Sequence, residues 1–106
     1  MITVEITRDS GQRIVQFQVK GHSGSAPRGK DIICAGVSAL TQSALLGLSQ
    51  YLNRTIRWQA ADGLLSMELC NLPDDQTSAV LETMLLGLQE IAKLEPDYVR
   101  IVEYRR

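Results

Sequence analysis

The sequence is poor in the residues on which most metal and disulfide sites depend. Its 106 residues include one histidine, His22, and two cysteines, Cys34 and Cys70. One histidine and two distant cysteines lack a zinc-binding spacing such as Cys-x-x-Cys, so we expect neither a metal nor another cofactor. Two cysteines in a chain without an export signal also favour free thiols over a disulfide framework.

An excess of charge of either sign is absent as well. The 11 Lys+Arg and 12 Asp+Glu residues give a formal net charge of −1. A long nucleic-acid-binding surface normally requires a strongly basic balance, so we expect no direct nucleic-acid binding. The chain is 44% hydrophobic and 22% charged, which is ordinary for a globular protein and excludes a disordered one. Its length predicts a single domain over residues 1–106.

Targeting and membrane signals are also weak. Residues 1–5 contain no basic region and no apolar signal core, so we expect a protein that is not exported. The longest nearly uncharged stretch, Ile32–Asn53, is interrupted by Ser, Thr and Gln side chains. We therefore interpret it as a helix packed in a protein core and not as a membrane span.

Two stretches alternate apolar and polar residues in the manner of β-hairpins. Residues 2–7 and 15–20 alternate on either side of a turn at residues 9–11, and residues 56–60 and 65–69 flank Asp62-Gly63. Helical spacing follows each hairpin: from Ile32 to about Leu52, and from Asp74 to just before Pro96. A last strand covers residues 98–104. The order ββαββαβ predicts an α+β fold with a mixed or antiparallel sheet covered by two helices.

The segment between the first hairpin and the first helix is unusual. Residues 21–30 contain Gly21, Gly24 and Gly29 and little that could anchor a core, so we expect a long functional loop. The loop partly fits the phosphate-binding pattern Gly-x-x-x-x-Gly-Lys, but Asp31 stands where a Ser or Thr should hold magnesium. The pattern therefore argues against nucleotide binding, although Arg28 and Lys30 could attract an acidic or backbone-rich partner.

Cys34 occupies the position best suited to chemistry. If Asp31 is the N-cap, Cys34 lies in the first helical turn, where the N–H groups lack helical partners and the helix dipole is positive. Both features favour a thiolate, whereas the negative charge of Asp31 would oppose one, so the net effect on the thiol stays open. The same N–H groups could hold the oxyanion that forms when the sulfur attacks a carbonyl.

His22 is the only imidazole that could exchange a proton with Cys34. A single loop joins the end of its strand to the start of the cysteine's helix, so a Cys–His pair is geometrically reasonable. The alternative is that Cys34 is a small core residue and His22 a solvated loop residue. Ser23 or Ser25 could form a Ser–His site, but neither lies at a helix start.

Three further residues have open or lesser roles. Asp31 could cap the helix or orient His22. Ser38 shares a helix face with Cys34 and could bond back to a helix carbonyl, or donate near the sulfur or the histidine. Cys70, at the end of a strand, is interpreted as structural.

The segment Gly21-His22-Ser23-Gly24 and the segment Gly29-Lys30-Asp31-Ile32-Ile33-Cys34-Ala35-Gly36-Val37-Ser38 together resemble the ribosomal-processing cysteine protease family, Prp or YsxB-like. The resemblance extends over the whole chain in length and in the order of elements. It implies a cytoplasmic Cys–His endopeptidase that removes a short N-terminal extension from a large-subunit ribosomal protein, the twenty-seventh in the usual naming.

By position, the resemblance makes Cys34 the nucleophile, His22 the base, and Asp31 and Ser38 supporting residues. It also implies a homodimer and a glycine-rich loop that moves over the peptide substrate. The two broad apolar helices, which exceed what a small monomer needs to cover, agree with a dimer. The alternative to an enzyme is a non-catalytic ribosome-associated binding module.

Overall fold

The computed structural model describes residues 1–24 and 31–106, and its elements follow the predicted order. In chain order they are β1 (Ile2–Arg8), β2 (Ile14–Lys20), α1 (Ile32–Leu46), the π-helical turn η1 (Gly47–Tyr51), β3 (Ile56–Ala61), β4 (Leu64–Leu69), α2 (Asp75–Leu94) and β5 (Val99–Arg105). The predicted α+β class is confirmed.

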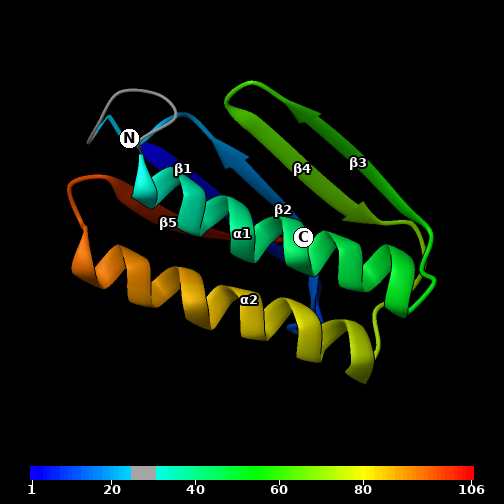
Figure 1. Cartoon of the computed structure of the whole chain (residues 1–106). Coiled ribbons are helices and arrows are strands. Elements are labelled where there is room, and N and C mark those ends of the chain that lie inside the picture. Colours follow the sequence, from blue (N-terminus) through cyan, green and yellow to red (C-terminus); the bar gives the residue numbers. More distant parts are fainter. Residues whose placement is uncertain (25–30) are drawn as a thin grey trace.

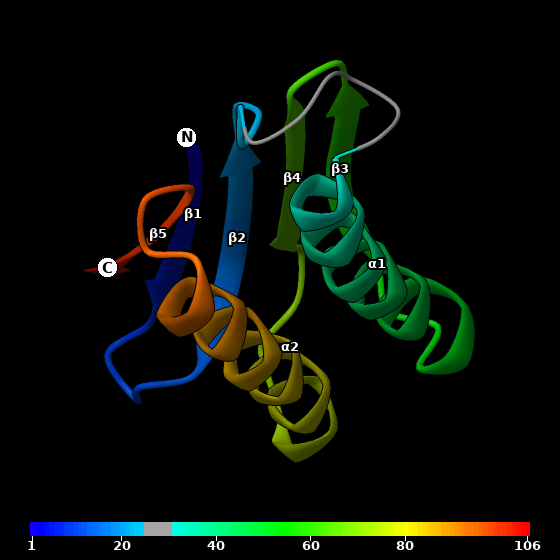
Figure 2. The same ribbon diagram turned by 60° about the vertical axis from the view of Figure 1, so that its left-hand side comes forward.

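The strands form one five-stranded sheet in the order β3-β4-β2-β1-β5. Neighbouring strands are antiparallel except for β1 and β5, which are parallel. Two parallel strands cannot be joined by a tight hairpin and need a longer crossover connection. Helix α2 lies in the connection that leads from β4 to β5. Helix α1 similarly lies between β2 and β3. Both helices cover the same face of the sheet (Figures 1 and 2), so the molecule has two layers.

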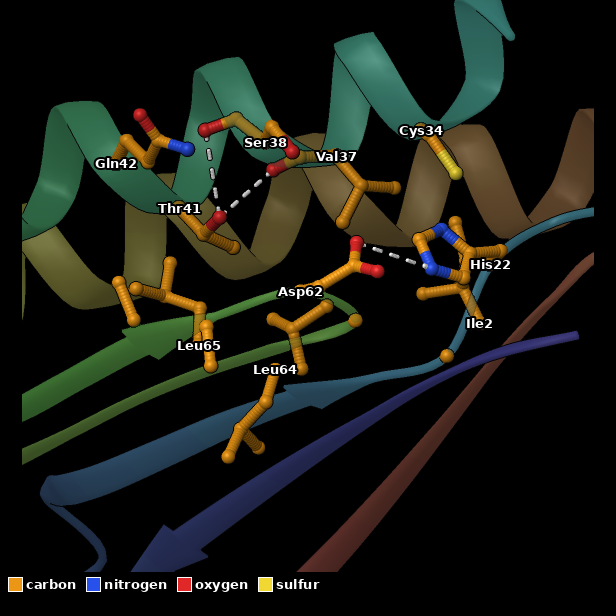
Figure 3. Close-up of a pocket in the computed structure, with 15 residues that line it drawn as sticks. Ile2, His22, Cys34, Val37, Ser38, Thr41, Gln42, Asp62, Leu64 and Leu65 are labelled. Carbon is orange, nitrogen blue, oxygen red and sulfur yellow. Dashed lines mark hydrogen bonds and ion pairs between the residues drawn. The ribbon is translucent and has the colours of Figure 1, made fainter. Parts of the chain in front are cut away.

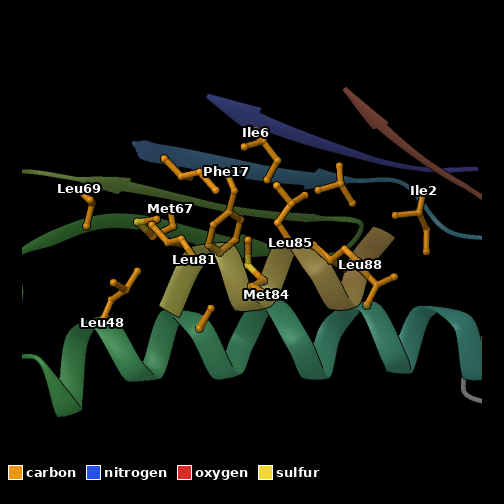
Figure 4. Close-up of a cluster of buried hydrophobic side chains, with 14 of the residues drawn as sticks. Ile2, Ile6, Phe17, Leu48, Met67, Leu69, Leu81, Met84, Leu85 and Leu88 are labelled. Carbon is orange, nitrogen blue, oxygen red and sulfur yellow. The ribbon is translucent and has the colours of Figure 1, made fainter. Parts of the chain in front are cut away.

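The core lies between these layers (Figure 4). In β1 the apolar residues Ile2, Val4 and Ile6 are buried, and the polar residues that alternate with them belong to the opposite face of the sheet. Helix α2 contributes a row of side chains at helical spacing: Leu81, Met84, Leu85 and Leu88. The alternating and helical patterns of the sequence therefore meet in one apolar cluster.

Helix α1 and η1 together carry no charged side chain. Residues Ile32–Tyr51 form 20 residues of mean hydropathy 1.6, long and apolar enough to cross a membrane by length and composition alone. A core helix passes the same test. Val37, Ala44 and Leu48 belong to the buried cluster, and buried Thr41 donates its hydroxyl to the Val37 carbonyl at 2.9 Å. One face of the helix therefore packs in the core, as predicted, although only 22% of the stretch is buried.

The sheet order brings two distant turns together. Because β4 pairs with β2, the turn between β3 and β4 lies beside the end of β2. The Gly21 N–H donates to the Gly63 carbonyl at 2.8 Å. Gly21 has a φ of +91°, and a Cβ there would lie 2.4 Å from the Met1 carbonyl oxygen, so only glycine fits. This junction positions the residue that follows, His22.

We predict that Leu88→Ala lowers the free energy of unfolding by about 2–5 kcal/mol, because Leu88 is fully buried and its truncation leaves a cavity. Leu86→Ala is the matched control, since Leu86 lies on the same helix and is 64% exposed. Its effect should stay within about 0.5 kcal/mol. Urea unfolding measures both, and equal losses would contradict the packing described for α2.

Candidate active site

An open pocket lies at the end of the sheet where β2 ends, α1 begins and β3 turns into β4. Its volume is about 260 Å³. Cys34 and Ser38 line it from α1, His22 from the segment after β2, and Asp62 and Gly63 from the β3–β4 turn (Figure 3). Ile2 of β1 lines the pocket as well, so the pocket combines residues from four separate segments of the chain.

Asp31 is the N-cap of α1, as predicted. Its Oδ1 accepts hydrogen bonds from the backbone N–H groups of Ile33 and Cys34, both at 3.0 Å. The Ala35 N–H donates to the Asp31 carbonyl at 3.1 Å. The expectation that unpaired N–H groups of the first turn hold an oxyanion is therefore wrong for these three residues, because Asp31 already accepts from each of them.

The second carboxylate oxygen of Asp31 connects the helix to the segment that contains His22. Ser23 donates its hydroxyl to Asp31 Oδ2 in a short hydrogen bond. Ser23 is only 3% exposed, so it cannot serve as an exposed nucleophile, and its hydroxyl acts in support of Asp31. Of the two roles considered for Asp31, the structure shows the cap.

The Cys34 sulfur is half-buried and accepts a hydrogen bond from the Ser23 backbone N–H at 3.3 Å. This donor comes from the chain beside His22 and not from α1. The sulfur therefore has a backbone donor that sequence reasoning did not identify.

His22 and Cys34 point toward one another across the pocket (Figure 3). The His22 side chain is 47% exposed, and its carbonyl accepts a hydrogen bond from the Met1 nitrogen at 2.6 Å. The structure thus brings together the two residues that the sequence predicted as a pair. The imidazole is exposed to solvent and lies on the side of the pocket that the Cys34 sulfur faces.

Asp62 is the residue of this site that sequence reasoning missed. Its Oδ1 lies 3.6 Å from His22 Nε2, on the side of the imidazole away from Cys34 (Figure 3). In the sequence, Asp62-Gly63 indicated only a hairpin turn. No local pattern could have placed that turn beside His22, because the contact depends on the pairing of β2 with β4.

The remaining predicted residues have different outcomes. Ser38 is exposed in the pocket wall, one turn after Cys34. Gly24 has a φ of +75°, and no described residue lies within 4 Å of a Cβ built there. Gly29, with Ser25, Arg28 and Lys30, lies outside the described residues. Cys70 is exposed just after β4, so it is not a core residue. Within residues 1–24 and 31–106, no group of three His, Cys, Asp or Glu side chains could hold a metal.

Comparison with known proteins agrees with this geometry. The sequence matches the family model described as cysteine protease Prp over residues 1–100. It is 29% identical over 104 residues to a protein of Staphylococcus aureus strain Mu50 named ribosomal processing cysteine protease Prp. That match covers 95% of this chain and 97% of the other protein.

Two crystal structures of an essential ribosomal processing protease Prp from S. aureus resemble this fold. One, in complex with a covalently linked product peptide, has a TM-score of 0.91 at 26% identity and covers 97% of this chain and 99% of its own. The other, in complex with a substrate peptide, has a TM-score of 0.86 at 25% identity with the same coverage. Because the family model spans nearly the whole chain and the fold is shared, this chain belongs to the cysteine protease Prp family.

Proposed function

We propose that residues 1–106 form a single catalytic domain, a cytoplasmic endopeptidase that removes a short N-terminal extension from a large-subunit ribosomal protein. In this proposal Cys34 is the nucleophile and His22 is the base. The observation that carries it is the arrangement of Cys34 and His22, which face one another in one open pocket. Family membership favours this enzyme over the alternative of a non-catalytic ribosome-associated module.

The proposed reaction begins with transfer of the Cys34 thiol proton to His22. The thiolate then attacks the peptide carbonyl, and the tetrahedral intermediate collapses to a thioester as His22 gives the proton to the leaving amine. Water next attacks the thioester with His22 as base, which releases the new carboxylate and restores the thiol. The Ser23 N–H, which contacts the sulfur, supports the first step.

The supporting roles proposed for Asp31 and Ser38 rest on their positions. Asp31 links the first turn of α1 to Ser23, so it holds the Cys34 sulfur close to the Ser23 N–H that donates to it. Ser38 lines the pocket one turn further along α1. The S. aureus relatives with a substrate peptide and with a covalently linked product peptide support a peptide as the substrate class.

We predict that Cys34→Ala abolishes cleavage, with a loss of at least about 10³-fold, because removal of the nucleophile ends covalent catalysis. The measurement is mass spectrometry of a peptide that spans the junction of the candidate ribosomal extension. Cys70→Ala, the matched cysteine control, should retain activity within about twofold, because Cys70 does not line the pocket. Persistent cleavage by Cys34→Ala, with or without ribosome binding, would contradict the proposed function.

We also predict that iodoacetamide labels Cys34 faster than Cys70, although Cys34 is the less exposed of the two. The thiolate is the reactive form, and only Cys34 has an imidazole facing its sulfur. His22→Ala should slow labelling of Cys34 and leave Cys70 unchanged. Tryptic peptides separate the two cysteines, and equal wild-type rates would contradict activation of Cys34.

A homodimer is the expected assembly. Helix α1 carries no charged side chain, and Ile32 and Tyr51, at the ends of the α1–η1 helix, are each 82% exposed. Contiguous uncharged surface of this kind favours association. We predict that light scattering at micromolar concentration gives twice the 11.7 kDa chain mass. A mass of 11.7 kDa would contradict the dimer and leave the proposed peptidase activity intact.

A further inference from the structure

The β3–β4 turn packs directly against the imidazole of His22. Gly63 has a φ of +72°, and a Cβ built there would lie 3.3 Å from His22 Nε2. Any side chain at this position would therefore crowd the ring and strain the backbone. Glycine lets the turn approach the imidazole closely, and it brings the preceding residue, Asp62, to the same ring nitrogen.

The turn is also held in place relative to His22. The Gly21 N–H donates to the Gly63 carbonyl at 2.8 Å, so the residue before His22 is bonded to the residue after Asp62. The β3–β4 ladder continues to Ala61 and Leu64, the two residues that flank the turn. The carboxylate of Asp62 and the ring of His22 thus sit on two segments joined by a backbone hydrogen bond.

Asp62 and Cys34 approach the imidazole from different sides. Asp62 Oδ1 lies 3.6 Å from Nε2, and the ring nitrogen that faces Cys34 in Figure 3 is the other one, Nδ1. Asp31, the second candidate carboxylate, accepts hydrogen bonds from the α1 backbone and from Ser23. Among these groups, Asp62 is the carboxylate on the Nε2 side of His22.

We propose that Asp62 is a positioning residue for His22, which keeps Nε2–H toward the turn and Nδ1 toward the Cys34 sulfur. This inference rests on the proposed function. In the reaction, the thiol proton moves to Nδ1 and later to the leaving amine, while Asp62 stays ionised beside Nε2–H throughout. Its charge stabilises the imidazolium formed in the first step and does not enter the proton balance.

The size of the effect follows from distance and exposure. The 3.6 Å contact is longer than a hydrogen bond and is an ion pair only while His22 is protonated, and the Asp62 side chain is 60% exposed. Solvent screens such a pair. The contribution should therefore be far below the roughly 10⁴-fold effect of a buried triad carboxylate. A peptide bound in the pocket would exclude water and strengthen the contact between Asp62 and His22. We therefore expect removal of the carboxylate to lower kcat.

The test is steady-state cleavage of the same peptide by Asp62→Asn, with Glu90→Gln as the control for the loss of one negative charge. Glu90 is an exposed residue of α2 that does not line the pocket. We expect Asp62→Asn to lower kcat about tenfold with KM changed by less than about twofold. Asp62→Glu, which restores the carboxylate, should recover part of kcat, and Glu90→Gln should match the wild type.

Labelling of Cys34 by neutral iodoacetamide gives a second readout that requires neither substrate nor turnover. Asp62→Asn should slow this labelling and leave Cys70 unchanged. If Asp62→Asn has the kcat of the wild type, or changes KM alone, the positioning role is overturned. In that case, loss of cleavage in Cys34→Ala would still support the proposed function. If Cys34→Ala cleaves the peptide, both proposals fall together.

Discussion

The carboxylate of Asp31 is the interaction on which the site depends. One oxygen accepts from two N–H groups of α1, and the other accepts from the Ser23 hydroxyl. A single side chain thus starts the helix and holds the strand-end segment against it. The Ser23 amide then reaches the Cys34 sulfur at 3.3 Å. This bridge joins the cysteine and its backbone donor, which come from two different segments of the chain.

This arrangement separates two tasks that helix starts often combine. At many helix N-termini the free N–H groups bind an anion directly. Here the Asp31 carboxylate accepts hydrogen bonds from the N–H groups of Ile33 and Cys34, and the N–H that donates to the sulfur belongs to Ser23. The helix therefore fixes the geometry, while the segment after β2 supplies both the sulfur's hydrogen-bond donor and the imidazole. The chemistry depends on how firmly that segment is held.

The residues that sequence reasoning found are those with local signals. The alternation in β1, the cap at Asp31 and the position of Cys34 in the first turn are each set within a few residues, and all three are present in the structure. The Asp62 contact and the Ser23–Cys34 hydrogen bond were not foreseen. The first depends on β2 pairing with β4, and the second depends on the path of the chain after Gly21. Periodicity identifies hairpins but not which of their strands become neighbours.

The parallel pairing of β1 with β5 has a consequence for how the enzyme matures. Ile2 of β1 lines the pocket, and its N–H donates to the carbonyl of Tyr98, just before β5. During translation, nearly a hundred residues separate the emergence of Ile2 from that of its partner strand. Contacts of such long sequence separation form late. Until β5 has been synthesised, β1 therefore lacks its parallel partner strand, and the sheet edge beside the pocket residue Ile2 is incomplete.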